Sequence, residues 1–265
     1  EIGGTVGEYE NILFLEAARM MKIKHPKDVM FVMVSYLPVP SKVGEMKTKP
    51  TQHAVRLLNS AGIQPNIIIA RADVVLDKKR KEKISTFCNV RPEHVISAPD
   101  VESIYDIPIN FERDHISDAI VEVLGLRERV QASNLTKWKR FAQKAKESDE
   151  QVHIAIVGKY FDTGDFVLSD AYISVIESIK FSAYAQGRKP VLSWINAVDF
   201  EDKANLTRLE EYDGVLVPGG FGERGIEGKL NVIQYVREHT IPYFGLCYGM
   251  QLLTIEYARN VVGLS

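Results

Sequence analysis

Two kinds of apolar segment alternate along the first half of the chain. Longer segments with apolar residues three or four positions apart, or with a lysine-rich outer face, predict helices at 12 to 21, 54 to 61, 74 to 87 and 116 to 124. Short runs rich in Val and Ile predict strands at 29 to 36, 63 to 70 and 94 to 97. This alternation predicts an α/β fold, in which a mainly parallel sheet is covered by helices on both faces.

A strongly polar segment, 127 to 151, precedes a second series of such elements. Its main apolar residues are Trp138 and Phe141, and we expect a linker helix on the surface. Ser169 is a good N-cap for a helix that runs to about residue 186. Further strands are predicted at 152 to 157, 191 to 195, 214 to 217 and 243 to 245. This order fits a flavodoxin-like sheet, so we expect two α/β domains, at 1 to 126 and 152 to 265, with functional residues at the carboxyl ends of the strands.

Composition narrows the class of protein. The chain has 265 residues, 45% of them hydrophobic, and a formal net charge of −2, which argues against binding to nucleic acid or to a membrane surface. It has no apolar run long enough to span a membrane and no signal peptide. The two cysteines, Cys88 and Cys247, cannot form a disulfide framework and fit a reducing cytoplasm. We expect Cys88 to be a small core residue.

Cys247 is the strongest candidate for chemistry. It lies in Gly245-Leu-Cys-Tyr-Gly249, between a predicted strand and a predicted amphipathic helix. This pattern is typical of a nucleophile elbow, in which small flanking residues permit a strained turn that exposes the nucleophile. The helix N-terminus would favour the thiolate, and its N–H groups could hold an oxyanion. Taken alone, the motif fits a buried structural cysteine about equally well.

A glycine-rich loop about thirty residues upstream favours the nucleophile over the structural cysteine. Val217-Pro-Gly-Gly220-Phe-Gly follows a predicted strand and could supply a second oxyanion donor. Together, the loop and the elbow resemble the class I (triad) glutamine amidotransferases, whose cysteine attacks the glutamine amide, forms a glutamyl thioester and releases ammonia. The resemblance implies that Cys247 is the nucleophile and that Gly220 belongs to the oxyanion and glutamine loop. It also implies a glutamine pocket lined by Tyr248, where the family more often has leucine, and by Gly249, Met250 and Gln251.

Two N-terminal motifs suggest a nucleotide site. The first ten residues form a glycine-rich loop that carries the carboxylates of Glu1, Glu8 and Glu10, which suits a metal or a ribose hydroxyl, or else is a plain glycine turn before a helix. Further along, Lys47 and Lys49 alternate with hydroxyl residues before the helix predicted at 54 to 61. Such a run suits a triphosphate, although a solvated lysine pair is the commoner meaning.

Four segments in order, 1 to 8, 44 to 52, 87 to 90 and 103 to 108, followed by the elbow, resemble the CTP synthase family along essentially the whole chain. The resemblance implies a P-loop-type synthetase (amidoligase) domain and a class I glutaminase domain. In that family ATP and Mg²⁺ phosphorylate O4 of UTP, and ammonia from glutamine then displaces the phosphate to give CTP. Carried over, Glu1 is a Mg²⁺ ligand, and the UTP or CTP site consists of Glu8, Tyr9, Glu10, Lys83 and, at a subunit interface, Lys47, Thr48, Lys49, Pro50, Thr51 and Gln52.

The resemblance also sets expectations about missing parts and partners. No Gly-x-x-x-x-Gly-Lys-Ser/Thr P-loop occurs, and all six histidines precede Cys247, whereas the family's triad His and Glu follow the cysteine. We read His239, the nearest in sequence, as a surface residue. Both domains therefore look truncated, and we expect the chain alone to be inactive. Partners implied by the family are UTP, ATP, glutamine, the feedback inhibitor CTP, the activator GTP and further subunits of a cytoplasmic homotetramer.

Two other functions stay open from the residues alone. A cobyrinic acid amidase would also couple an ATP-dependent synthetase domain to a cysteine elbow, but residues 47 to 52 speak against it. A non-catalytic paralogue would bind nucleotide, or assemble with longer chains, without turnover. Binding of a corrin precursor without binding of UTP or CTP would favour the first alternative. A gene with neither a P-loop upstream nor a His-Pro-Glu-like motif downstream would favour the second.

Overall fold

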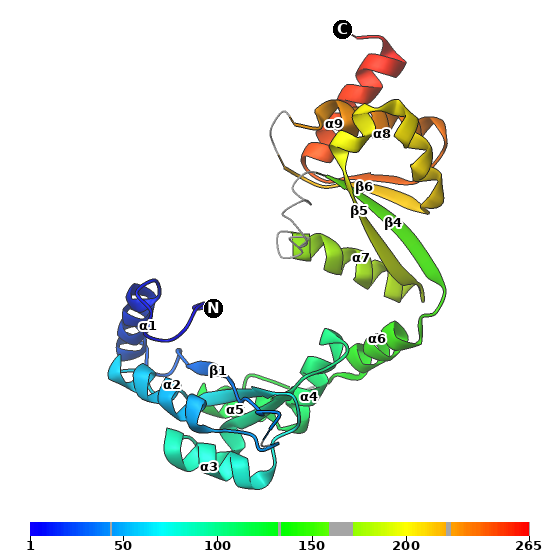
Figure 1. Ribbon diagram of the computed structural model, residues 1–265. Helices are drawn as coiled ribbons and strands as arrows, with labels where there is room; N and C mark the ends of the chain where they lie inside the picture. Colours follow the sequence, from blue (N-terminus) through cyan, green and yellow to red (C-terminus); the bar gives the residue numbers. More distant parts are fainter. Residues whose placement is uncertain (43, 132–133, 159–171, 221–223, 265) are drawn as a thin grey trace. The chain divides into compact units, whose positions relative to one another are not determined.

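The computed structural model describes residues 1–42, 44–131, 134–158, 172–220 and 224–264. The chain divides into two compact units, Glu1–Ala142 and Gln143–Ser265, and each contains its own sheet (Figure 1). The division falls within helix α6 (Thr136–Glu147), which occupies only part of the polar segment predicted as a linker helix. Within the described ranges, no helix combines the length and apolar character needed to cross a bilayer.

Unit 1 contains a three-stranded parallel sheet in the order β1-β2-β3. The strands are β1 (Val32–Tyr36), β2 (Ile67–Ala72) and β3 (Val95–Pro99). All three predicted strands are confirmed, but β2 begins four residues later than predicted because Pro65 has no N–H for the ladder. The helices of this unit are α1 (Ile12–Lys24), α2 (Lys49–Ser60), α3 (Lys78–Cys88), α4 (Ile107–Arg113) and α5 (Ile116–Val123).

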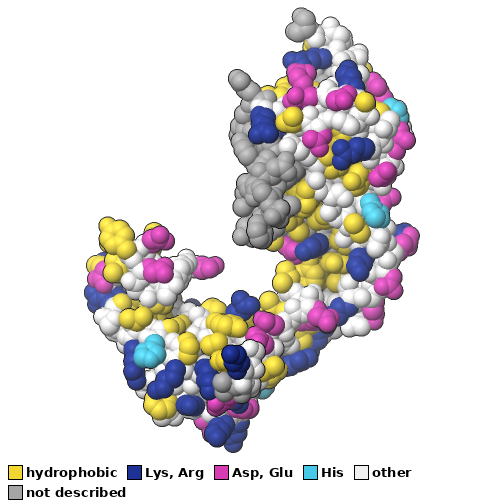
Figure 2. Space-filling view, in the orientation of Figure 1, with side chains coloured by type: hydrophobic (Ala, Val, Ile, Leu, Met, Phe, Trp, Pro, Cys, Tyr) yellow, Lys and Arg dark blue, Asp and Glu magenta, His cyan; other side chains and the backbone are white. Residues whose placement is uncertain are grey.

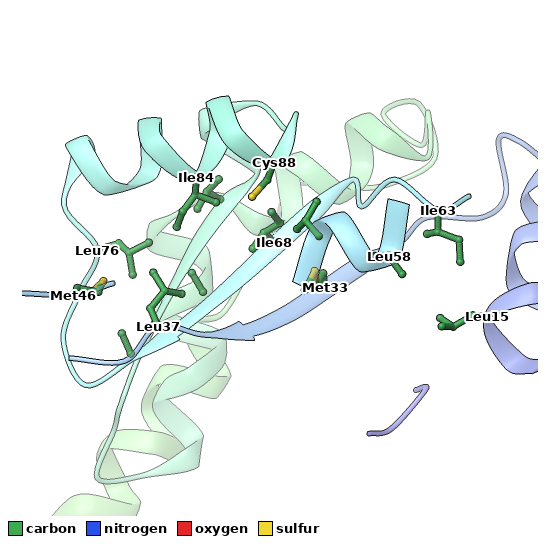
Figure 3. Close-up of a cluster of buried hydrophobic side chains, with 14 residues drawn as sticks. Leu15, Met33, Leu37, Met46, Leu58, Ile63, Ile68, Leu76, Ile84 and Cys88 are labelled. Carbon is green, nitrogen blue, oxygen red and sulfur yellow. The ribbon is translucent and has the colours of Figure 1, made fainter. Parts of the chain in front are cut away.

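Helices cover both faces of this sheet, as predicted. On one face, residues of the sheet pack with α2 and α3; Met33, Ile68, Ile84 and Cys88 are labelled in Figure 3. Cys88 is 2% exposed, so it is the core residue that the sequence predicted. On the other face, Ile67 and Ile96 pack with Ala119 of α5. The sheet is therefore the central layer of a three-layer unit.

Helix α2 begins five residues earlier than predicted. Its first residue is Lys49, and Pro50 occupies the first turn, where a missing N–H costs no helical hydrogen bond. Thr51 and Gln52 are therefore buried helix residues instead of part of a loop before the helix. The hydroxyl groups of Thr51 and Ser35 lie 2.8 Å apart, which fixes the start of α2 against β1.

Unit 2 contains a four-stranded parallel sheet in the order β5-β4-β6-β7. Its strands are β4 (Gln151–Gly158), β5 (Lys189–Asn196), β6 (Gly214–Val217) and β7 (Tyr243–Gly245), so the last two match their predicted bounds. The helices are α7 (Ile173–Ala185), α8 (Ile226–Glu238) and α9 (Tyr248–Tyr257), of which the sequence pattern does not predict α8. The predicted N-cap Ser169 lies outside the described residues.

Both faces of the second sheet are also covered. Ile156 and Leu216 pack with Val175 and Ile179 of α7 on one face. Val157 and Val217 pack with Val232 and Val236 of α8 on the other. The two-domain, mainly parallel α/β architecture predicted from the sequence is confirmed, and the loops after β6 and β7 leave the sheet at the same edge.

Candidate functional site

Cys247 occupies the turn between β7 and α9, as a nucleophile elbow requires. Its backbone has φ 51° and ψ −105°, a conformation that residues with a side chain rarely adopt. The thiol is exposed and immediately precedes the first turn of α9. The positive end of the helix dipole favours an anion formed at this position. Within the first turn, Gly249 N already donates to the carbonyl oxygen of Leu246 at 2.9 Å.

Close backbone packing explains the two glycines that flank the cysteine. A Cβ on Gly245 would lie 2.6 Å from the carbonyl carbon of Gly249, and a Cβ on Gly249 would lie 2.2 Å from the carbonyl oxygen of Val217. Neither position can hold a larger residue without moving the backbone. The turn is further fixed because Leu246 N donates to the carbonyl oxygen of Val217, at 2.9 Å.

The loop after β6 lies directly beside the nucleophile. Val217 at the end of β6 pairs with Gly245 at the end of β7, so both loops start at the same level of the sheet. A Cβ on Gly219 would lie 3.3 Å from Cys247 Cβ and 3.7 Å from its Sγ. Gly220 follows with φ 129°, which only glycine adopts readily. Sequence reasoning singled out Gly220; Gly219, which also lies beside the nucleophile, could have been found as the first glycine after the strand.

The other residues of the predicted glutamine pocket have different environments. Tyr248 is half-buried against α8, Gly249 is buried in the turn, and Met250 and Gln251 are exposed on α9. The hydroxyl of Tyr243, for which no sequence signal exists, donates to the carbonyl oxygen of Gly249 at 2.9 Å. Burial raises the pKa of this tyrosine, which favours its neutral, hydrogen-bond-donating form.

Neither His239 nor Cys88 takes part in this arrangement. His239 caps the C-terminus of α8, and its exposed ring stacks on Tyr235 at 3.8 Å. It precedes β7 at the amino edge of the sheet, whereas Cys247 follows β7 at the carboxyl edge, which agrees with the surface role predicted for it. Burial raises the pKa of the Cys88 thiol to about 11, so Cys88 is a poor nucleophile near neutral pH.

A cluster of basic side chains lies around Glu45 in unit 1. Lys47 Nζ is 2.6 Å from Glu45 Oε2. The hydrogen bond from Lys47, together with the charges of Lys47, Arg80 and Lys83, lowers the pKa of Glu45. The charge of Lys83 of α3 therefore acts on the same carboxylate that Lys47 contacts. Arg80 is a further cation here that sequence reasoning missed, and Figure 2 shows Lys and Arg side chains concentrated on the side of unit 1 that carries α3.

The rest of the predicted phosphate run forms the first turn of α2. Lys49 is exposed, and its Nζ lies 5.7 Å from the centre of the Phe87 ring. Gln52 is 1% exposed, and its Nε2 donates to Thr48 Oγ1 at 3.1 Å. The buried Oε1 atom of Gln52 has no hydrogen-bond donor among the described residues.

The glycine-rich N-terminal loop lies at the opposite end of α2. Asn11 Nδ2 donates to the carbonyl oxygen of Thr5 at 2.6 Å, and Thr5 N donates to Glu8 Oε2 at 3.3 Å. Gly7 lines a small cavity together with Leu57 and other residues at the C-terminal end of α2. Lys47 lies at the other end of this 12-residue helix, which is about 18 Å long. One chain therefore does not bring the two predicted parts of the nucleotide site together.

The predicted metal ligand, Glu1, is an exposed carboxylate. In the part of the chain that the structure describes, no three His, Cys, Asp or Glu side chains are grouped as a ready-made metal site. A lone exposed carboxylate still suits Mg²⁺ that keeps water and phosphate oxygens as its other ligands.

Two family models match successive parts of the chain. The family model described as "CTP synthase N-terminus" matches residues 1–126, and the one described as "Glutamine amidotransferase class-I" matches residues 167–265. A solved structure of a Trypanosoma brucei CTPS glutaminase domain with bound acivicin aligns with a TM-score of 0.39, at 37% identity over 43% of this chain and 42% of that chain.

Curated relatives align along the whole chain. The CTP synthases of Caldanaerobacter subterraneus subsp. tengcongensis and Thermococcus gammatolerans are 47% and 48% identical to it over 265 residues. The alignments cover 100% of this chain and 48% of each relative, so the chain spans about half the length of the curated relatives it matches. With a synthase N-terminal region followed by a class I amidotransferase region, and with relatives at this level of identity, the chain belongs to the CTP synthase family.

Proposed function

We propose that this protein acts as a glutamine-hydrolysing CTP synthase, a ligase that uses ATP to aminate UTP. The observation that carries the proposal is the position of Cys247, in a strained turn at the start of α9 and beside Gly219. The basic cluster of Lys47, Arg80 and Lys83 in unit 1 supports the nucleotide half of the reaction.

In the glutaminase half, the sulfur of Cys247 attacks the carbonyl carbon of the glutamine side-chain amide. The negative charge that develops on the oxygen is held by the N–H of Tyr248, the residue after the nucleophile, and by an N–H of the loop at Gly219 and Gly220. Collapse of this intermediate breaks the C–N bond, and the amide nitrogen leaves as ammonia once it is protonated. The remaining glutamyl thioester is hydrolysed by water to glutamate, which restores the thiol.

In the synthetase half, the γ-phosphoryl group of ATP moves to O4 of UTP, and ammonia then displaces phosphate to give CTP. The charges of Lys47, Lys49 and Lys83 would bind the triphosphate group of the nucleotide. Thr48, Thr51 and Gln52, at the start of α2, would complete this site. Mg²⁺ bound with ATP would neutralise phosphate charge, and Glu1 would be one of its ligands.

We also propose that the pyrimidine nucleotide site lies between two copies of the chain in a homotetramer. The length of α2 supports this, because Gly7, the residue before Glu8, lies at one end of the helix and Lys47 at the other. Exposed apolar side chains of α1 also support it, since Leu13 is 78% and Phe14 65% exposed.

Feedback inhibition by CTP, activation by GTP and a cytoplasmic location are parts of the same proposal.

The two halves of the reaction correspond to a proposed division of the chain. We assign residues 1 to 126 to the synthetase domain, 127 to 151 to the linker and 152 to 265 to the glutaminase domain. The family models at 1–126 and 167–265 support this assignment.

Labelling of Cys247 tests the proposal without requiring turnover. A chloromethyl ketone analogue of glutamine should alkylate Cys247 once per chain, as measured by intact mass, and Cys247→Ser should abolish the reaction. Buried Cys88 is the internal control and should stay unmodified in the folded protein. Isothermal titration with CTP tests the nucleotide half. Binding of CTP without labelling would favour the non-catalytic paralogue, and the absence of both would refute the proposal.

A further inference from the structure

Lys229 is a lysine that the glutaminase mechanism above does not use, yet it is almost fully buried. It lies in the first turns of α8 and is 2% exposed. Lysine is almost never buried to this degree unless its charge is compensated, because its ammonium group must give up its hydration. A buried ammonium therefore calls for an explanation in its surroundings.

One such neighbour is the residue that follows the nucleophile. Lys229 Nζ lies 5.7 Å from the centre of the Tyr248 ring, within the range of about 6 Å for a cation–π interaction. The Tyr248 ring also packs in an apolar cluster with Leu230, Ile233 and Leu252. The ammonium and the ring therefore interact in a largely dry environment, where such a contact is strongest.

The position of Lys229 is rigidly determined by its own helix. A Cβ on the preceding residue, Gly228, would lie 1.8 Å from the carbonyl oxygen of Ala197, so α8 packs directly on the backbone of the 3₁₀ helix Ala197–Glu201. This close approach leaves α8 no room to shift toward that helix. Lys229 can therefore act as a fixed point for the Tyr248 ring.

The Tyr248 ring and the Tyr248 N–H belong to the same residue, at the first position of α9. In a nucleophile elbow, the N–H of the residue after the nucleophile is an oxyanion donor. We propose that Lys229 is a positioning residue for glutamine hydrolysis: its buried ammonium holds the Tyr248 ring and so orients the Tyr248 N–H toward the developing oxyanion. This inference rests on the proposed glutaminase function.

Two electrophiles separate positioning of the oxyanion donor from general reactivity of the thiol. A chloromethyl ketone analogue of glutamine has a carbonyl oxygen that can use the oxyanion site, whereas iodoacetamide alkylates a thiol by direct displacement and does not need that site. The measured quantity is the ratio of the two rate constants for Cys247, obtained by intact mass. Trp194 of β5 lies in the same unit, so its fluorescence, measured in a Trp138→Phe background, reports any loss of folding there.

Lys229→Met keeps the length and apolar contacts of the side chain and removes its charge. We expect it to lower the ratio at least about tenfold, with the iodoacetamide rate and the Trp194 fluorescence unchanged. Lys229→Arg should stay within about threefold of the wild type because it keeps the cation. In a Tyr248→Leu background, Lys229→Met should have less than about a twofold further effect. Lys203→Met, at an exposed position of the same unit, is the matched control.

The outcomes distinguish this inference from the proposed function. If the wild type reacts with the chloromethyl ketone no faster than a simple thiol does, the glutaminase function fails and the role of Lys229 fails with it. If the wild type shows the preference and Lys229→Met keeps it, only the positioning role is overturned. An equal fall in both rate constants, or a full effect of Lys229→Met in the Tyr248→Leu background, would also overturn it.

Discussion

Arg237 of α8 and Glu256 of α9 form a two-pronged ion pair, with Nε 3.0 Å from Oε2 and Nη2 2.7 Å from Oε1. Glu256 is 0% exposed, and Asn260 Nδ2 donates to its Oε1 at 3.1 Å. Burial raises the pKa of Glu256, but the hydrogen bonds from Arg237 and Asn260 outweigh it and leave the pKa below its ordinary value of 4.5. This ion pair therefore links α9, the helix that begins directly after Cys247, to α8.

Replacing Glu256 by Gln should therefore destabilise unit 2 in a pH-dependent way. The pKa of Glu256 is lower in the folded state than in the unfolded state. The carboxylate therefore stabilises the fold fully above about pH 4.5, and this stabilisation is lost as the pH falls through the folded-state pKa. At pH 7 we expect Glu256→Gln to lower the free energy of unfolding by about 2 kcal/mol, and this difference from the wild type should narrow as the pH falls through the folded-state pKa of Glu256. Urea unfolding followed by Trp194 fluorescence, in a Trp138→Phe background, measures this difference.

Glu238→Gln is the matched control for this prediction. The Glu238 carboxylate contacts the same guanidinium, 3.4 Å from Arg237 Nη2, but its side chain is 48% exposed. Exposed ion pairs contribute little, so this variant should unfold like the wild type. A difference between Glu256→Gln and the wild type that does not narrow at all as the pH falls below 4.5 would contradict the assigned role of the carboxylate charge.

Gly249→Ala should disrupt the elbow. The new Cβ would lie 2.2 Å from the carbonyl oxygen of Val217, so α9 must move away from β6. Overpacking of this kind costs about 1–3 kcal/mol, and the displaced Cys247 should lose most of its reaction with the glutamine chloromethyl ketone. In the control variant Gly3→Ala, nothing lies within 4 Å of the new Cβ, so Cys247 should react with the chloromethyl ketone as in the wild type. Normal labelling of Gly249→Ala would show that the turn tolerates a side chain.

Local patterns were enough to predict the elbow and the strands around it. β6 and β7 have their predicted bounds because each is a short apolar run that ends at a glycine or proline signal. Cys247 could be placed on the turn because Gly245 and Gly249 leave few other conformations for that segment. Burial of Cys88 follows similarly from its apolar surroundings and the lack of any elbow around it.

Contacts between distant segments explain what the sequence could not predict. Helix α8 includes Gly228 and Lys229, which interrupt its apolar pattern and make sense only against Ala197 and Tyr248. The early start of α2 depends on Thr51 bonding to Ser35 in another element. Arg80 lies close to Glu45 only because α3 folds back beside the start of α2.

Thr240 offers a stabilising substitution. It has φ 56°, a left-handed conformation that is unfavourable for a β-branched residue, in the turn between α8 and β7. Thr240→Gly should raise the free energy of unfolding of unit 2 by about 1 kcal/mol because glycine adopts this conformation without strain. Asn89→Gly, at φ 53° in unit 1, should gain less, since asparagine already tolerates the left-handed region. Destabilisation by Thr240→Gly would mean that the hydrogen bond from Thr240 Oγ1 to His239 O outweighs the strain.

Removing Lys47 and Lys49 together should weaken CTP binding. Each contributes a point charge to the same polyanion, so we expect the Kd of the double alanine variant to rise about tenfold at low salt. The ratio to the wild type should shrink as added salt screens these charges. Isothermal titration at 50 and at about 300 mM salt measures both effects. The matched control is the double variant Lys78→Ala with Lys79→Ala, on the exposed start of α3. If the Lys47 and Lys49 double variant bound CTP as tightly as the wild type, these two lysines would be solvated surface residues without a role in binding.

Glu45→Gln should have the opposite effect on the same measurement. In the protein without nucleotide, the Glu45 carboxylate lies 2.6 Å from Lys47 Nζ, and it also interacts with the charges of Arg80 and Lys83. A triphosphate must compete with this carboxylate for the same cations. The neutral amide should therefore lower the Kd for CTP about threefold, since exposed ion pairs are worth little, and high salt should erase the gain. Glu82→Gln, on the same helix as Lys83, is the control. Weaker CTP binding by Glu45→Gln would mean that this carboxylate orients Lys47 for the phosphate instead of competing with it.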